Sequence, residues 1–218
     1  MDARMLVDGL CMYLGLLVLL TFHEFGHAWI AYKCGDDTAY VQGRVSLNPI
    51  VHIDPIGTVA LPLLTLLLSM TGSGLRNFLV GWAKPVPVNP YNLRNPRVDD
   101  ILVTLAGPWM NFLLAIVLVG LARLGLMAHS EAAASVCLDM ARLSLLLCFF
   151  NLIPIPPLDG SQVVRSLIGM SYEAYHQMVY YGYFVLIVVL QIPQVQLLLQ
   201  TVTHNSLMTI CRWFGMGW

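Results

Sequence analysis

Residues 5–32 read MLVDGLCMYLGLLVLLTFHEFGHAWIAY, and this stretch decides the fold. It is apolar over more than the roughly 20 residues that a helix needs to cross a bilayer. Lys33 suits the last turn of such a helix, and Gly35 suits the cap that follows it. The stretch therefore predicts a helix that spans a membrane.

The composition of the whole chain agrees with a membrane protein. Of the 218 residues, 58% are hydrophobic and 11% are charged, with a net charge of −1. An ordinary soluble domain carries about 25% charged residues, so a soluble globule and a disordered chain are both excluded. The charge is too nearly balanced for a nucleic-acid partner, which requires a basic face. The five cysteines show no CxxC spacing, and we interpret them as small hydrophobic residues.

Further apolar runs predict more spanning helices. The last of these runs is shorter and more mixed, and it either spans or lies in the membrane interface. The runs cover residues 101–121, 136–153, 175–192 and 195–218. We therefore expect an all-α polytopic membrane protein with about four or five transmembrane helices. It would form a single domain over 1–218, with a core at about 5–170 and C-terminal helices at 175–218.

One apolar run is too short to span. Residues 59–70 are interrupted by Pro62 and lead into a Thr-Gly-Ser-Gly stretch that ends at Gly74. This pattern predicts that 59–82 is a re-entrant hairpin. Next to it, 83–97 contains four prolines and is expected to be extended, while 40–47 alternates like a short β-strand.

His23, Glu24 and His27 lie inside the first apolar stretch, where ionisable groups are costly and usually functional. Residues four apart share one helix face, so two imidazoles can point at one ion. Glu24 is rotated from His23 by about 100°. HExxH on a helix is typical of zinc proteases, with two ligands and a general base. The alternative is a buried polar cluster that stabilises helix packing.

A catalytic zinc takes a third protein ligand and a water. The candidates are His52, Asp54, His129, Asp159, His176 and His204. Asp159 stands out because it lies in the segment NLIPIPPLDG (151–160), whose prolines prevent a regular helix. Non-helical backbone at membrane depth is tolerated where it lines a cavity. Asp159 also fits a helix N-cap, and the two roles are compatible.

With these motifs in place, the chain resembles the site-2 protease family of intramembrane zinc metalloproteases. The resemblance rests on HEFGH (23–27), GRVSLNPIVHIDPIG (43–57), AGPWMN (106–111) and NLIPIPPLDG (151–160), and it covers roughly residues 15–170. It implies that His23, His27 and Asp159 ligate one zinc ion per chain. It also implies that Glu24 is the general base and that Asn151 lines the active site. Larger members carry a PDZ domain between core helices, for which this chain has no room between 121 and 136.

The implied activity is hydrolysis of peptide bonds in or near transmembrane segments of membrane proteins. Asn151 or His52 would stabilise the oxyanion, and 40–47 or 84–88 would pair with an unwound substrate. One alternative is a metal transporter or sensor with the same ligands, although that would not need Glu24. Another is a non-catalytic scaffold derived from the family.

Counting membrane crossings predicts the orientation. If 59–82 turns back, the chain crosses twice between Lys33 and Asp159, and all ligands meet near one face. Most of the Lys and Arg residues gather on that face: Lys33, Arg44, Arg76, Lys84, Arg94, Arg97 and Arg165. Basic residues favour the cytoplasmic side, so we expect a plasma-membrane protein with its active site towards the cytoplasm. The sequence predicts no oligomeric state.

Overall fold

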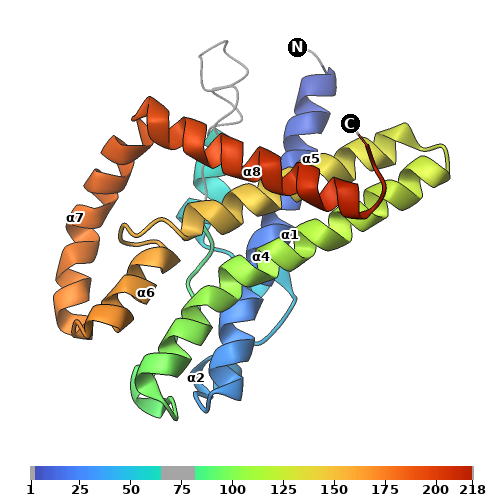
Figure 1. The fold of residues 1–218 in the computed structure, drawn as a ribbon. Coiled ribbons are helices and arrows are strands. Elements are labelled where there is room, and N and C mark those ends of the chain that lie inside the picture. Colours follow the sequence, from blue (N-terminus) through green and yellow to red (C-terminus); the bar gives the residue numbers. More distant parts are fainter. Residues whose placement is uncertain (1–2, 65–81, 218) are drawn as a thin grey trace.

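The structure is a computed structural model that describes residues 3–64 and 82–217 (Figure 1). Over these residues it is helical, with no β-strand. The long helices are α1 (Ala3–Lys33), α4 (Pro96–Met127), α5 (Glu131–Asn151), α6 (Asp159–Ile168), α7 (Tyr172–Leu190) and α8 (Pro193–Trp213). The short ones are α2 (Thr38–Val41), η1 (Pro49–His52), η2 (Pro55–Ala60) and η3 (Pro90–Asn92). The prediction of an all-α polytopic membrane protein is confirmed.

Three of the described helices are long and apolar enough to cross a membrane. They are α1 from Gly9 onwards, α4 and α5, which correspond to the first three predicted spans. α1 ends at Lys33, as its sequence predicts. α4 and α5 follow one another through a short turn and pack against each other, and α1 crosses them (Figure 1).

The sequence predicts that 175–192 spans the membrane and that 195–218 either spans or lies in the interface, and the C-terminal helices differ from the first of these expectations. α7 and α8 qualify only as a pair, with a bend of 82° between them. By length and composition the described residues therefore contain three candidate spans, or four if the bent pair counts as one, where the sequence predicts about four or five. α8 is less apolar than the spanning candidates, because it carries the polar side chains Gln194, Gln196, Gln200, His204 and Asn205. Buried in lipid without partners, such groups would cost free energy.

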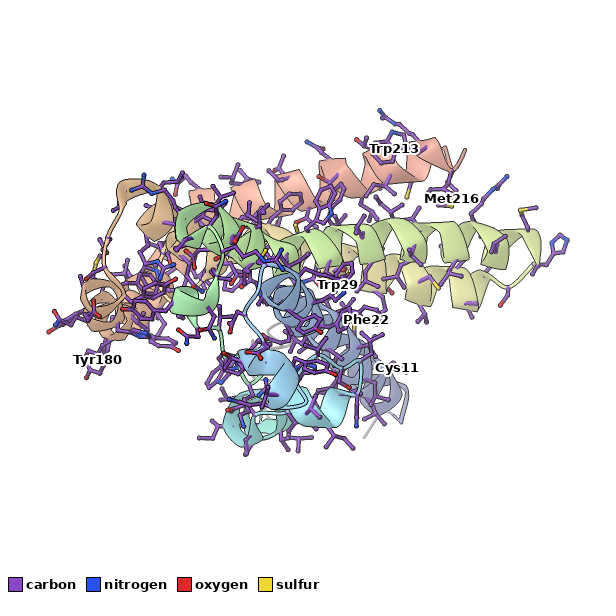
Figure 2. All side chains as sticks on the ribbon, turned by 90° about the horizontal axis from the view of Figure 1, so that it is seen from below. Cys11, Phe22, Trp29, Tyr180, Trp213 and Met216 are labelled. Carbon is purple, nitrogen blue, oxygen red and sulfur yellow. The ribbon has the colours of Figure 1, made fainter. Side chains whose placement is uncertain are left out.

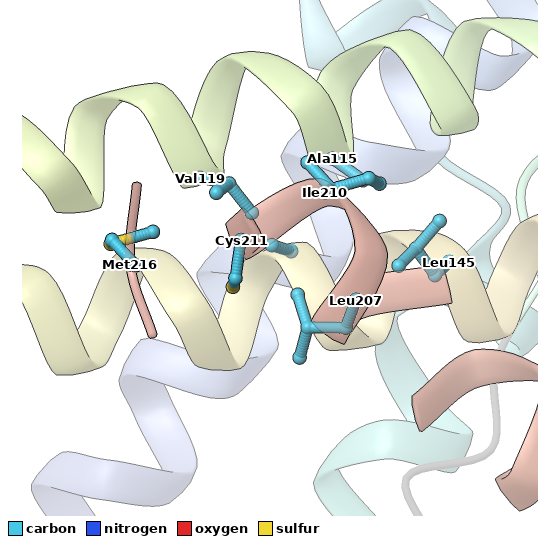
Figure 3. Packing of buried hydrophobic residues seen from close by; sticks show 8 residues of the cluster. Ala115, Val119, Leu145, Leu207, Ile210, Cys211 and Met216 are labelled. Atoms are coloured by element: carbon cyan, nitrogen blue, oxygen red, sulfur yellow. The ribbon is translucent and has the colours of Figure 1, made fainter. Parts of the chain in front are cut away.

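α8 packs along the α4–α5 pair and forms the largest apolar cluster with it. Figure 3 shows Val119 of α4, Leu145 of α5 and Ile210 of α8 meeting at this contact, where all three are almost fully buried. Outward-facing positions carry large apolar side chains, among them Tyr180 of α7 and Trp213 of α8 (Figure 2). A chain that leaves so many such residues exposed is suited to a lipid environment.

The chain leaves α1 and enters α4 at the same end of the bundle. The backbone N–H of Arg94 donates to the Cys34 carbonyl over 3.1 Å, which ties the start of α4 to the end of α1. The predicted hairpin at 59–82 lies largely outside the described residues, as does its expected turn. Its two flanks meet, since the Trp82 N–H donates to the Gly57 carbonyl over 3.1 Å.

The prediction of a strand at 40–47 is wrong. Residues Thr38–Val41 form the short helix α2, and a turn follows at Gly43, whose φ is 67°. The cause is local hydrogen bonding, because the Asp36 carboxylate accepts from the backbone N–H and the hydroxyl of Thr38. Such side-chain-to-backbone bonds favour turns over strands. Residues 83–89 are extended, as their prolines predict.

Candidate metal centre and active site

His23 and His27 project from one face of α1 into the interior. Their Nε2 atoms lie 3.1 Å apart, and the His23 side chain is almost fully buried. This is the arrangement that an i, i+4 spacing produces on a regular helix. Both ring nitrogens that could bind an ion therefore face the same point.

Asp159 is brought to that point by α6, of which it is the first residue. Its Oδ2 atom lies 3.2 Å from Nε2 of His23 and 3.5 Å from Nε2 of His27. The partial positive charge of a helix N-terminus favours a carboxylate there. The N-cap residue is Leu158, so the capping role that the sequence allows for Asp159 is not used. Its side chain points to the histidines instead.

The three groups fit a zinc ion. Ligand atoms about 2.0–2.1 Å from a tetrahedral zinc are about 3.3 Å from one another. The three observed separations of 3.1, 3.2 and 3.5 Å lie around that value. Oδ2 of Asp159 is also buried without a hydrogen-bond partner among the described residues, as suits an atom reserved for an ion. In the part of the chain that the structure describes, no other group of three His, Cys, Asp or Glu side chains is close enough to share a metal ion.

The other third-ligand candidates lie elsewhere. Asp54 caps η2 by accepting from the backbone N–H groups of Ile56 and Gly57. His129 occupies the turn after α4, while His176 and His204 lie on α7 and α8. His52 lies beside the middle of α1, where it lines a small pocket with Leu17, Leu20 and Thr21.

Backbone and side-chain groups of α4 orient both histidines. Nδ1 of His27 lies 2.7 Å from the Val103 carbonyl, and this bond leaves the Nε2 lone pair free for an ion. Nδ1 of His23 lies 3.2 Å from the amide of Asn111, which is fully buried. Sequence analysis reached Asn111 only through a family motif and missed Val103. A buried amide within an apolar run is the signal that could have singled out Asn111.

Two glycines let α1 and α4 approach closely enough for these contacts. A Cβ on Gly26 would lie 2.7 Å from the Ala106 carbonyl oxygen. A Cβ on Gly107 would lie 2.3 Å from Nε2 of His27, inside the space that the ligands share. Only glycine allows the ligand pair to lie directly against α4.

Glu24 lies beside the ligand set and not within it. Its Oε2 atom accepts a hydrogen bond of 3.0 Å from the backbone N–H of Val86, in the extended segment 83–89. Arg44 fixes that segment by donating from Nη2 to the carbonyls of Lys84 and Pro85, over 2.6 and 3.3 Å. The extended segment therefore runs past the carboxylate that the sequence predicts as the general base.

The two oxyanion candidates differ in their hydrogen bonding. Nδ2 of Asn151 donates to the Leu147 carbonyl over 2.9 Å, within its own helix. The His52 ring is buried and binds the Ser46 carbonyl through Nε2 over 2.8 Å. Its burial lowers its pKa below the ordinary value, although the Ser46 bond opposes this, so the ring stays neutral. Its remaining nitrogen then carries a lone pair and not a proton.

A helical membrane bundle with an HExxH pair, a buried carboxylate and a neighbouring glutamate belongs to the class of intramembrane zinc metalloproteases. Comparison with known proteins agrees, because the model of "Peptidase family M50" matches residues 11–190. The chain belongs to this family, the site-2 protease family.

Two curated relatives carry matching names. The chain is 40% identical over 188 residues to "Putative zinc metalloprotease YwhC" of Bacillus subtilis (strain 168), covering 82% of this chain and 78% of that protein. It is 37% identical over 147 residues to "Putative zinc metalloprotease Rip2" of Mycobacterium tuberculosis (strain H37Rv), covering 67% of this chain and 52% of that protein. No solved structure matches the chain.

Proposed function

We propose that this chain is an endopeptidase that uses one zinc ion to hydrolyse peptide bonds in or near the transmembrane segments of membrane proteins. The observation that carries the proposal is the triangle of Nε2 of His23, Nε2 of His27 and Oδ2 of Asp159, with sides of 3.1 to 3.5 Å. These three residues would hold the ion. A bound zinc lowers the pKa of a water to about 7 and polarises the scissile carbonyl.

Glu24 performs the proton transfers in this proposal. It takes a proton from the attacking water and later passes it to the nitrogen of the leaving amine. The Val86 N–H on Oε2 orients the carboxylate and leaves Oε1 for the proton. A set of ligands that only carried or sensed a metal would not need a glutamate held in this way.

Asn151 is the better oxyanion donor of the two candidates. A primary amide has two N–H bonds, and the Leu147 carbonyl engages one of them, which leaves one for the substrate. The neutral His52 ring has a single N–H, and it donates to Ser46. We therefore assign stabilisation of the oxyanion to Asn151. We assign His52 a structural role, in which it holds the turn at Ser46 against η1.

The substrate strand is proposed to pair with residues 84–88. Peptide bonds of a helix in lipid are already hydrogen-bonded, so a substrate must unwind before hydrolysis. Within this segment the Val86 N–H and the carbonyls of Lys84 and Pro85 are already engaged, so an unwound strand would pair with the remaining backbone groups of 84–88. Residues 40–47 do not offer such an edge, because they form α2 and a turn.

The active site is proposed to lie towards the cytoplasmic face of the plasma membrane. Lys33, Arg94 and Arg97 lie at the end of the bundle where α1 stops and α4 starts, and Arg165 lies on α6, the helix that carries Asp159. Arg44 and Lys84 lie between α1 and α4 in the sequence, beside or within the segment that contacts Glu24. An excess of Lys and Arg favours the cytoplasmic side. A single cysteine replaces either Lys33, at the end of α1, or His129, in the turn after α4. Labelling of each variant in intact cells tests this orientation.

Reconstituted protein tests the activity. The full chain in liposomes is given a membrane-embedded model substrate, and cleavage is followed before chelation, after chelation and after return of Zn²⁺. The proposal expects cleavage that is lost with the metal and restored by it, at a bond in or near the substrate's transmembrane segment. Cleavage that continues in metal-free protein would contradict the proposal.

A further inference from the structure

A buried polar cluster joins α4, α6 and α7 away from the metal centre. Asp100 of α4 forms an ion pair with Arg165 and accepts a hydrogen bond from Ser166, both of α6. Tyr172, the first residue of α7, donates to Oδ1 of Asp100 over 2.6 Å. Asp100 and Arg165 are 5% and 2% exposed, so this is a desolvated charge pair and not a surface contact.

The cluster is closed on its remaining side by an aromatic ring. The guanidinium carbon of Arg165 lies 3.6 Å from the ring centre of Tyr172, and its Nη2 atom donates to the Tyr172 hydroxyl over 3.0 Å. A planar guanidinium that is both stacked and hydrogen-bonded has little freedom to move. The cluster therefore fixes the geometry between the three helices that it joins.

The position of the cluster along α4 and α6 relates it to the metal centre. On α4, Asp100 precedes Gly107 by seven residues, and Gly107 lies against the metal-ligating histidines. On α6, Ser166 follows Asp159 by seven residues. Seven residues are about two helical turns, so each pair shares one helix face at a separation of about 10 Å. The two helices therefore run antiparallel. Asp100 of α4 lies opposite Ser166 of α6, and Gly107, which lies against the two histidines, is at the level of Asp159.

The energetics favour a geometric role over a purely stabilising one. A buried ion pair is weak evidence for stability, because the cost of desolvating two charges can exceed their attraction. Such pairs are best supported as devices that select one packing register. Here a rotation or slide of α6 along α4 would break the cluster and move Asp159 away from Nε2 of His23 and His27.

We propose that Asp100, Arg165 and Ser166 are positioning residues for the metal ligand Asp159. They set the rotation and the register of α6 on α4, and so hold the carboxylate at ligand distance from the two histidines. The inference rests on the proposed function, because it assumes that Asp159 binds zinc.

The test measures metal binding by the purified full chain in detergent. The main variant is Asp100→Asn with Arg165→Met, which removes both charges together and so leaves no unpaired buried charge. The second is Ser166→Ala, which removes one hydroxyl. Arg123→Met, at an exposed position of α4, is the matched control. Zn²⁺ affinity is measured by chelator competition, and the visible absorption of bound Co²⁺ reports the coordination geometry.

We expect the double variant to bind Zn²⁺ at least about tenfold more weakly, the range found when partners of metal ligands are removed. Its Co²⁺ spectrum should change, Ser166→Ala should shift affinity in the same direction by less, and the control should match the wild type. Wild-type affinity and spectrum in a folded double variant would overturn the inference, as would a lower unfolding temperature with unchanged metal binding. If the double variant does not fold, Ser166→Ala decides by the same criteria. Absence of zinc binding by the wild type would instead contradict the proposed function.

Discussion

Gly107 of α4 lies so close to His27 of α1 that a methyl group built on it would come within 2.3 Å of Nε2. The same methyl group would come within 2.7 Å of Cε1 of His23. The contact between α1 and α4 and the candidate metal centre are therefore one structural feature.

Gly107→Ala is expected to abolish zinc binding and cleavage. Alanine favours a helix over glycine by about 1 kcal/mol, so any loss comes from the collision with the histidines and not from the helix itself. Gly120→Ala on the same helix is the control, because its Cβ would meet only the Phe214 ring, at 3.2 Å. Metal analysis and a cleavage assay measure both effects. Wild-type zinc content in Gly107→Ala would contradict the geometry described for the site.

Asp36→Asn is expected to lower kcat about tenfold without changing zinc content. This loss corresponds to an activation barrier that is higher by about 1.4 kcal/mol. The Asp36 carboxylate accepts from the Asn89 N–H over 2.7 Å and from the Asn92 amide over 3.1 Å. It therefore anchors the extended segment whose Val86 N–H holds Glu24. The exposed Asp37→Asn is the control, and the account would be wrong if both variants behaved alike.

Asn151→Leu is expected to lower kcat by about 10²- to 10³-fold, the usual cost of losing an oxyanion donor. Zinc content should not change, because Asn151 is not among the ligands. His52→Gln should cost less than tenfold in kcat, since the only N–H of the neutral ring is engaged by Ser46. Steady-state kinetics of the two variants decide between the donors. A larger loss for His52→Gln would reverse the assignment.

Unfolding temperature should depend on pH through His52. Its burial depresses the pKa below the ordinary 6.5, so the unfolded chain binds the proton more readily than the folded one. The contribution of the neutral ring to the free energy of unfolding is fully present above about pH 6.5. It is lost as the pH falls through the folded-state pKa of His52. Thermal unfolding between about pH 8 and 5 should show a smaller decline in His52→Gln than in the wild type. Parallel curves would contradict this.

The metal centre was largely predictable because its parts carry local signals. An HExxH pair in an apolar stretch places His23 and His27 on one face from helix geometry alone. Among six candidates for the third ligand, Asp159 stands out through the prolines that precede it, since they prevent a helix at membrane depth, and the family resemblance implies its role as a ligand. Both arguments need only short-range information, and the structure brings the three side chains together.

Contacts between distant segments had no such signal. The bond from Val86 to Glu24 joins residues 62 positions apart, and the one from Tyr172 to Asp100 joins residues 72 apart. Neither alters the pattern of the sequence around it. The strand predicted at 40–47 failed for a related reason, because hydrogen bonds to Asp36 outweighed the alternating pattern. The bend between α7 and α8 falls directly before Pro193, which cannot continue the preceding helix, and hydropathy alone does not reveal such a break.

The proposed mechanism requires that Glu24 acts on a substrate at a zinc ion that other residues hold. Glu24→Gln tests it most directly, because the glutamine keeps an oxygen for the Val86 N–H but cannot accept the proton. Zinc content and cleavage of a membrane-embedded substrate are measured on the same preparation, beside the wild type and Asp159→Asn. Glu24→Gln is expected to keep its zinc and to lose at least about 10²-fold in cleavage rate, whereas Asp159→Asn is expected to lose both. Cleavage by Glu24→Gln at the wild-type rate, with zinc bound, would contradict the proposed mechanism.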